Sequence, residues 1–254
     1  MKKNEPFSIV FENGSAIVVN KASGLSTTPE RHETDCKPLS KMFAQKIYVV
    51  HRIDKGTSGL VIFAKTREAH RALCLCFQNH LVEKTYIAVV HGAPSWRETE
   101  ITLNLLPDGN KKGQTIVDRF RGKKSVTRFK MAARAGNYSA VYAHPLTGRT
   151  HQIRSTLAFL KHPVVCDSLY GSEKPVFLSQ MKRGWRGDAF NERPIISRTA
   201  LHAEKLVFLK NPFPDEDFPL AFEAPLPRDM KALLNQMKKI NGFSSALELE
   251  PQSE

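Results

Sequence analysis

The chain has 254 residues, enough to bury a sizeable core, and its hydrophobic share of 41% and charged share of 25% are ordinary for a soluble globular protein. No apolar run approaches the ~18 residues of a membrane-spanning helix and no secretory signal follows the start, so we expect a cytoplasmic protein. The net charge of +13 favours a polyanionic partner, nucleic acid before an acidic membrane surface.

The first quarter of the sequence predicts strands joined by a polar loop. Residues 7–20 alternate between apolar and polar around Asn13-Gly14, which predicts a β-hairpin. Two short apolar runs, residues 47–50 and 60–64, predict two more strands. The segment between these runs is polar and contains two glycines, so we expect a loop joining the strands.

The middle of the sequence predicts a helix and further strands. Thr66 is a candidate N-cap for a helix whose buried face is formed by Ala69, Ala72, Leu73, Cys76 and Phe77. Residues 86–90 predict a strand, and residues 126–132 and 138–143 predict a strand pair. Residues 93–125 are polar, basic and interrupted by glycines, and we expect no regular structure there.

The last third predicts a turn at residues 147–150 that leads into a helix over 151–160. Residues 172–199 lack periodicity and are rich in Lys and Arg, so we expect an exposed basic insertion. Residues 206–209 and 219–222 predict a last strand pair. A closing helix is predicted from Leu226 to Ile240, with Met230, Leu233, Leu234 and Met237 on its apolar side.

These elements predict an α+β fold with a largely antiparallel, mixed β-sheet and flanking helices and loops. No internal repeat or linker is visible, so we expect one domain over residues 1–241, acting as a monomer. Residues 242–254 are acidic and predict a flexible tail.

The loop between the two short apolar strands contains Asp54, with Arg52 and Lys55 beside it. Positive neighbours favour the ionised carboxylate, which can act as a nucleophile or a base. Taken alone, the loop favours a structural alternative. Asp54 would then cap a turn, with Thr57 and Ser58 satisfying backbone amides of the loop.

Two other segments suggest ligand binding. In residues 147–154 a glycine turn precedes a predicted helix that carries Arg149 and Arg154, and helix N-termini and arginines suit phosphates. The alternative is a solvated basic helix end. Tyr86 begins a strand, where it either packs in the core with its hydroxyl at the rim or stacks on a base and handles a proton.

The order of these segments resembles the RluA family of pseudouridine synthases. The most specific parts are H-R-I-D-K-G-T-S-G-L at residues 51–60 and L-T-G-R-T-H-Q-I-R at residues 146–154. Shorter parts are V-V-N-K with S-G-L near residue 20, G-K-K-S-V-T at residues 122–127 and L-H-A at residues 201–203. The resemblance covers about residue 8 to residue 225, which implies a member without the N-terminal RNA-binding domain of some relatives.

The resemblance implies isomerisation of uridine to pseudouridine in ribosomal or transfer RNA, with no metal and no cofactor. It implies Asp54 as the essential carboxylate, Arg154 as its ion-pair partner and Tyr86 against the uracil. It implies substrate contacts at His51, Arg52, Thr57, Ser58, Arg149, Thr150, His151, Gln152 and Ile153. Because the target uridine must leave its helix, Arg52 is the candidate to fill the vacancy.

Three other functions compete with this interpretation. A non-catalytic RNA-binding protein on the same fold would have the same basic surface, but it would not need Asp54, Tyr86 and Arg154 together. A metal-dependent nuclease would need clustered carboxylates, and Asp54 has no acidic neighbour in the sequence. An enzyme for a small anionic metabolite would need a phosphate-binding glycine loop with a lysine, which is not found.

Overall fold

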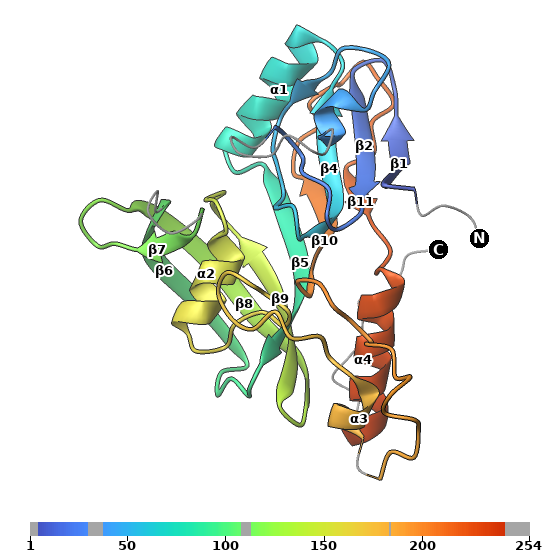
Figure 1. The fold of residues 1–254 in the computed structure, drawn as a ribbon. Helices are drawn as coiled ribbons and strands as arrows, with labels where there is room; N and C mark the ends of the chain where they lie inside the picture. The colour runs from blue at the N-terminus through green and yellow to red at the C-terminus, as the bar shows by residue number, and fades with distance from the viewer. Residues whose placement is uncertain (1–4, 30–37, 108–112, 183, 242–254) are drawn as a thin grey trace. The chain divides into compact units, whose positions relative to one another are not determined.

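The computed structural model describes residues 5–29, 38–107, 113–182 and 184–241 (Figure 1). The predicted tail, residues 242–254, lies outside these ranges. Contacts group the chain into two compact units where the sequence predicts one domain. The first unit comprises residues up to Tyr86 together with 201–226, and the second comprises 87–200 together with the segment from Pro227 onward. The two units are described in turn.

The first unit contains a mixed sheet with the strand order β1-β2-β4-β10. Its strands are β1 (Phe7–Glu12), β2 (Ala16–Lys21), β3 (Tyr48–Val49), β4 (Ser58–Ala64), β10 (Leu201–Phe208) and β11 (Ala221–Glu223). The hairpin β1–β2 and the strand pair β10–β11 form as predicted, and both are antiparallel. β3 is also antiparallel to β4, whereas β10 runs parallel to β4. A short 3₁₀ helix, η1, spans Leu39–Lys41.

Every residue of β4 is buried, because apolar groups cover both faces of this strand. Successive side chains of a strand point to opposite faces. Leu60 and Ile62 accordingly pack in one cluster, with the buried face of α1 (Arg67–Gln78), while Val61 and Phe63 pack in the other. Thr66 caps α1 as predicted, since its hydroxyl accepts a hydrogen bond from the amide of Ala69 at 3.1 Å.

The second unit contains a sheet with the strand order β5-β9-β8-β6-β7, and the chain passes from the first unit to the second within β5. The strands are β5 (Val82–His91), β6 (Glu98–Pro107), β7 (Thr115–Val117), β8 (Lys123–Ala135) and β9 (Tyr138–Pro145). The helices are α2 (Gln152–Phe159), α3 (Leu178–Met181) and α4 (Arg228–Asn241). Met230, Leu233 and Met237 of α4 are fully buried, as expected.

The prediction of no regular structure over residues 93–125 is wrong. This segment holds β6, β7 and the start of β8, which form antiparallel pairs. The exposure of β6 alternates along most of its length, as is typical of a strand with one solvated face. The burial of β6 therefore alternates with a period of two, although many of its residues are polar or charged. Gly113 and Gly122 lie outside the strands, Gly122 directly before β8.

The predicted basic insertion, residues 172–199, contains only the short helix α3 as regular structure in its described part. It is not wholly exposed, because Val176 and Ile196 form a β-bridge and are both buried. Among the residues that the structure describes, no helix is long and apolar enough to cross a bilayer.

Gly59 lies where β4 comes close to β10 in the first unit. Its φ is +116°, and a Cβ atom would lie 2.1 Å from the carbonyl oxygen of Ala203 in β10. Gly24 also has a positive φ, of +88°, but a Cβ there would meet no atom within 4 Å. Only the first position therefore combines backbone strain with a steric clash.

We expect Gly59→Ala to lower the free energy of unfolding by about 2–5 kcal/mol, from overpacking and backbone strain together. Gly24→Ala, which adds strain alone, should cost about 1 kcal/mol. Urea denaturation of both variants measures the difference. Equal losses would show that the β4–β10 approach does not constrain the fold.

Candidate active site

The loop that carries Asp54 is held by a buried lysine at the end of β2. Lys21 is fully buried, and its Nζ donates to the carbonyl oxygens of Ala22 at 2.9 Å, Leu25 at 2.7 Å and Lys55 at 3.3 Å. A buried ammonium group requires such acceptors, because it loses its hydration on folding. The lysine thereby joins the segment after β2 to the residue that follows Asp54.

Three further hydrogen bonds connect the segment after β2 to the Asp54 loop. They run from Gly24 N to Lys55 O at 2.8 Å, from Ser23 Oγ to Gly56 O at 2.7 Å and from Thr27 Oγ1 to Ile53 O at 2.9 Å. The loop also closes on itself, since the amide of Thr57 donates to the carbonyl of Asp54 at 3.0 Å. The backbone on both sides of Asp54 is therefore fixed, while its side chain is partly exposed.

His51 anchors the start of this loop. Its Nε2 accepts a hydrogen bond from the amide of Ile62 at 3.1 Å, and its ring stacks on Phe77 with centroids 4.7 Å apart. Burial, helped by the nearby charge of Lys84, lowers the pKa of His51 to about 3. The imidazole is consequently neutral at physiological pH and can keep accepting from the backbone.

Tyr86 lies against the apolar cluster of the first unit that contains Ile53. Burial raises the pKa of Tyr86, and the negative charge of Asp54 raises it further. The phenol is therefore protonated at neutral pH. Burial also lowers the pKa of Lys84 to about 8, so this neighbour on β5 loses part of its charge just above neutrality.

The remaining predicted residues of this loop differ in exposure. Arg52 is exposed, whereas Thr57 and Ser58 are buried. Ser58 Oγ lies 2.9 Å from His202 Nδ1, and this contact connects β4 to β10. These positions suit Arg52 to meet a ligand and give Ser58 a contact inside the protein. Substrate binding by His51, Thr57 and Ser58 stays a prediction.

In the second unit, Gln152 organises the turn before α2. Its Oε1 accepts from Thr147 Oγ1 at 2.8 Å and from the amide of Arg149 at 2.9 Å. Its Nε2 donates to Val126 O at 3.0 Å and Thr127 Oγ1 at 2.9 Å. The buried amide thus joins the turn to β8, and leaves Arg149 and Thr150 exposed on it.

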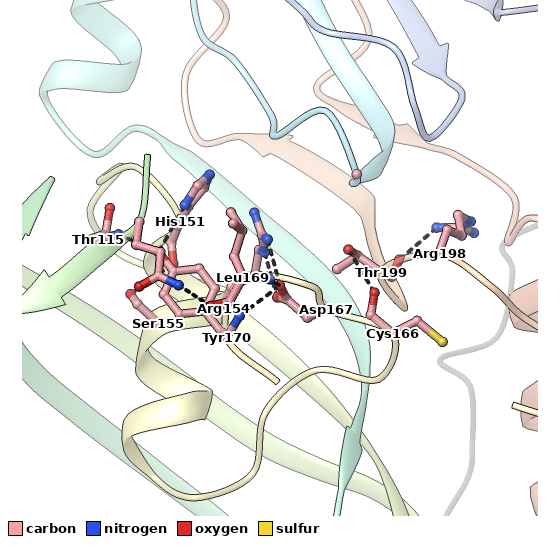
Figure 2. A network of polar contacts seen from close by, with 12 residues as sticks. Thr115, His151, Arg154, Ser155, Cys166, Asp167, Leu169, Tyr170, Arg198 and Thr199 are labelled. Carbon is pink, nitrogen blue, oxygen red and sulfur yellow. Dashed lines mark hydrogen bonds and ion pairs between the residues drawn. The ribbon is translucent and has the colours of Figure 1, made fainter. Parts of the chain in front are cut away.

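Arg154 forms a buried, bidentate ion pair with Asp167. Its Nε and Nη2 each donate to one carboxylate oxygen at 2.7 Å, and the side chains are 7% and 0% exposed (Figure 2). Asp167 Oδ1 also accepts from the amides of Leu169 and Tyr170. The guanidinium lies over the Tyr170 ring, with Cζ 5.2 Å from its centroid.

His151 and Tyr170 complete this network (Figure 2). His151 precedes α2 with a φ of 52°, and its Nδ1 lies 3.0 Å from the Tyr170 hydroxyl. The same hydroxyl accepts a hydrogen bond from the amide of Thr115 at 2.5 Å. Ile153 is buried in α2. The side chains of the second signature are therefore oriented by contacts within their own unit.

A family model described as RNA pseudouridylate synthase matches residues 15–159. The chain is 32% identical over 256 residues to ribosomal large subunit pseudouridine synthase D of Neisseria meningitidis serogroup B, covering 96% of this chain and 64% of that protein. It is 31% identical over 244 residues to the protein of the same name from Zymomonas mobilis, covering 91% and 73%. The chain belongs to the RNA pseudouridylate synthase family.

Two solved structures share the fold. Human RNA pseudouridylate synthase domain containing 4 matches with a TM-score of 0.69 and 19% identity, covering 91% of this chain and 92% of that one. Human RNA pseudouridylate synthase domain containing 1 matches with a TM-score of 0.59 and 24% identity, covering 94% and 98%. The predicted family and α+β fold are confirmed.

Asp167 and Lys21 are structural partners that the sequence motifs did not predict. Asp167 follows Val164, Val165 and Cys166, and a carboxylate at the end of such an apolar run needs a buried cation. The sequence spacing between Arg154 and Asp167 did not predict that Arg154 is this cation. A guanidinium has five N–H donors, so the bond to Asp167 does not exclude a second carboxylate. The pairing of Arg154 with Asp54 stays a prediction.

We expect Asp167→Ala to lower the free energy of unfolding by about 3–5 kcal/mol, because the buried Arg154 charge loses its carboxylate. Asp229→Ala is the matched control. It breaks a bidentate pair with Arg198 in the same unit, at 2.7 and 2.8 Å, whose side chains are 18% and 30% exposed. That loss should be about 1 kcal/mol. Thermal or urea denaturation compares them, and losses of the same size would contradict the argument from burial.

The pKa of His51 also predicts a pH dependence. A histidine in the unfolded chain takes up its proton near pH ~6.5, whereas His51 in the folded protein resists protonation down to about pH 3. The unfolded state therefore binds more protons in this window, and the free energy of unfolding falls as the pH is lowered through it. The contribution is fully present above the window.

We expect His51→Asn to reduce the acid sensitivity of unfolding. Asn retains an acceptor for the amide of Ile62 but does not titrate. The measurement is the urea midpoint at neutral and mildly acidic pH. His80→Asn, a change at an exposed position, serves as the control and should keep the wild-type slope. An unchanged slope in His51→Asn would show that His51 is not the group that titrates.

Proposed function

We propose that the chain isomerises uridine to pseudouridine in RNA, with Asp54 as the essential carboxylate. The main observation is the position of Asp54 beside the protonated phenol of Tyr86. The backbone of the Asp54 loop is held by hydrogen bonds from Lys21 and from the segment after β2. A clamped loop presents its carboxylate at one place, which is what positioning catalysis requires. Membership of the RNA pseudouridylate synthase family supports the reaction class.

In the proposed reaction the bond between uracil N1 and ribose C1′ breaks and a bond between C5 and C1′ forms. The proton on C5 is released as N1 regains one, so the product has the composition of the substrate and no co-reactant is consumed. Asp54 enters either as a nucleophile toward the nucleotide or as a base that deprotonates the ribose to give a glycal. Both routes need the ionised carboxylate.

Tyr86 is proposed to stack on the uracil and to donate a hydrogen bond from its hydroxyl. Removal of the C5 proton by its phenolate is disfavoured near neutral pH, because burial and the charge of Asp54 both raise its pKa. Arg154 is proposed to keep Asp54 ionised. In that role Asp167 would orient the guanidinium by its bidentate bonds.

The proposed substrate is a uridine in ribosomal RNA of the large subunit, because the two curated relatives above carry that name. Transfer RNA is the second candidate. The uridine must swing out of its helix to reach a carboxylate. Arg52 is exposed two residues before Asp54 and is proposed to fill the place that the base leaves. The excess of Lys and Arg supplies salt-dependent backbone binding.

We expect Asp54→Asn to abolish pseudouridine formation and to leave RNA binding within a few-fold of wild type, since the amide is isosteric but neither nucleophilic nor basic. The measurement is tritium release from RNA labelled at uracil C5, with affinity followed by filter binding. Asp215→Asn, an exposed change in the same unit, is the control and should retain full activity.

Normal turnover in Asp54→Asn would refute the catalytic assignment. An inactive wild-type protein that still bound RNA would favour the non-catalytic alternative. The substrate follows from pseudouridine maps of ribosomal and transfer RNA from cells with and without the gene. A site missing only from transfer RNA would overturn the ribosomal assignment and leave the reaction class intact.

A further inference from the structure

A single short turn between β7 and β8 presents an almost fully exposed phenylalanine. Phe120 is 97% exposed and is flanked by the exposed Arg119 and Arg121. An exposed aromatic ring costs free energy in water, and single exposed residues are common on protein surfaces. What distinguishes Phe120 is that its backbone is held rigidly and that its two exposed sequence neighbours, Arg119 and Arg121, are both basic.

Asp118 holds the turn that presents Phe120. Its Oδ1 accepts from the amides of Phe120 at 3.0 Å and Arg121 at 2.9 Å, and its Oδ2 accepts from Arg121 Nε at 2.9 Å. The turn is closed by a bond from Gly122 N to Asp118 O at 3.0 Å. A Cβ at Gly122 would lie 2.4 Å from that carbonyl, so the closure requires glycine.

Asn104 of β6 fixes the turn to the sheet. Its side-chain amide donates to the carbonyl of Arg119 at 3.0 Å, and its own carbonyl accepts from the amide of Asp118 at 2.9 Å. The aromatic ring is therefore exposed on a support that is already ordered before any ligand binds. Such preorganisation reduces the entropy that binding costs.

The surface around the turn is basic. Lys123 and Lys124 follow it and are exposed, and Arg149 Nε donates to the carbonyl of Lys124 at 3.0 Å. That bond brings the exposed Arg149 of the turn before α2 next to the start of β8. The resulting Phe120 patch consists of Arg119, Phe120, Arg121, Lys123, Lys124 and Arg149. The positive charge of the patch complements the negative charge of a polyanion.

We infer that the Phe120 patch binds an unpaired nucleotide of the RNA, with a base stacked on the Phe120 ring and the flanking cations on its phosphates. Aromatic rings between basic residues bind single-stranded nucleic acid in this way, because every base offers a π-face. The inference rests on the proposed function for the identity of the polymer. It adds the turn of Phe120 to the RNA contacts, and of the patch only Arg149 belongs to the two signatures.

The test measures the affinity of the full chain for a fluorescein-labelled RNA hairpin with an unpaired uridine-rich loop, and for the fully paired stem alone. We expect Phe120→Ala to bind the hairpin about tenfold more weakly and the stem as wild type does. Phe120→Trp should restore hairpin binding, while Phe120→Leu should not, because leucine keeps apolar surface without a π-face. Since Phe120 is exposed, all variants should keep the wild-type melting temperature.

Phe190 supplies a matched control. It is 100% exposed, and its amide donates to Asp188 Oδ1 at 2.9 Å, as that of Phe120 does to Asp118. Its immediate neighbours, Ala189 and Asn191, are uncharged. Phe190→Ala should leave hairpin binding unchanged. Equal losses in the two alanine variants, or full binding by Phe120→Leu, would overturn the stacking assignment.

The outcome is independent of catalysis. With saturating RNA, Phe120→Ala should turn over at the wild-type rate and show only a raised KM, since the patch holds RNA and does not touch the reacting atoms. A wild-type protein that forms no pseudouridine would refute the proposed function and leave the binding comparison interpretable. A variant with a lowered kcat and unchanged affinity would refute the patch alone.

Discussion

The arrangement of the candidate active site depends on one buried charge. Lys21 has no access to water, so folding must replace its hydration with protein acceptors. The backbone carbonyls that bind it belong to two segments far apart in sequence, the stretch after β2 and the Asp54 loop. Satisfying the ammonium group therefore forces these segments together. The position of the carboxylate follows from this requirement.

The second unit also contains a buried cation, but its partner is a carboxylate instead of backbone carbonyls. Arg154 is buried in α2 and takes its carboxylate from Asp167, which is itself held by two backbone amides. Gln152 connects segments in the same way without a charge, because its amide oxygen accepts from the turn before α2 and its amide nitrogen donates to β8. Residues that a motif presents as ligand contacts thus also serve as internal connectors. A motif alone does not separate these two uses.

The two kinds of surface in the chain differ for a physical reason. Around Asp54, burial keeps His51 neutral and lowers the pKa of Lys84, and the buried Lys21 holds the backbone of the loop. On the Phe120 patch, the basic side chains belong to exposed residues, and Arg121 is also paired with Asp118. The first environment suits chemistry on a single group, and the second suits salt-dependent binding of a polymer.

The sequence by itself determined the strands with strong apolar runs, the Thr66 cap, the closing helix and the family, because these depend on local periodicity and on ordered motifs. It also singled out Asp54, Tyr86 and Arg154. It missed β6, whose polar residues follow a period of two, and β7, which has only three residues. Only the tertiary structure decided that Arg154 binds Asp167, that Lys21 clamps the Asp54 loop and that Phe120 is presented on a rigid turn. Buried charges select partners by proximity in space, and sequence spacing does not encode that proximity.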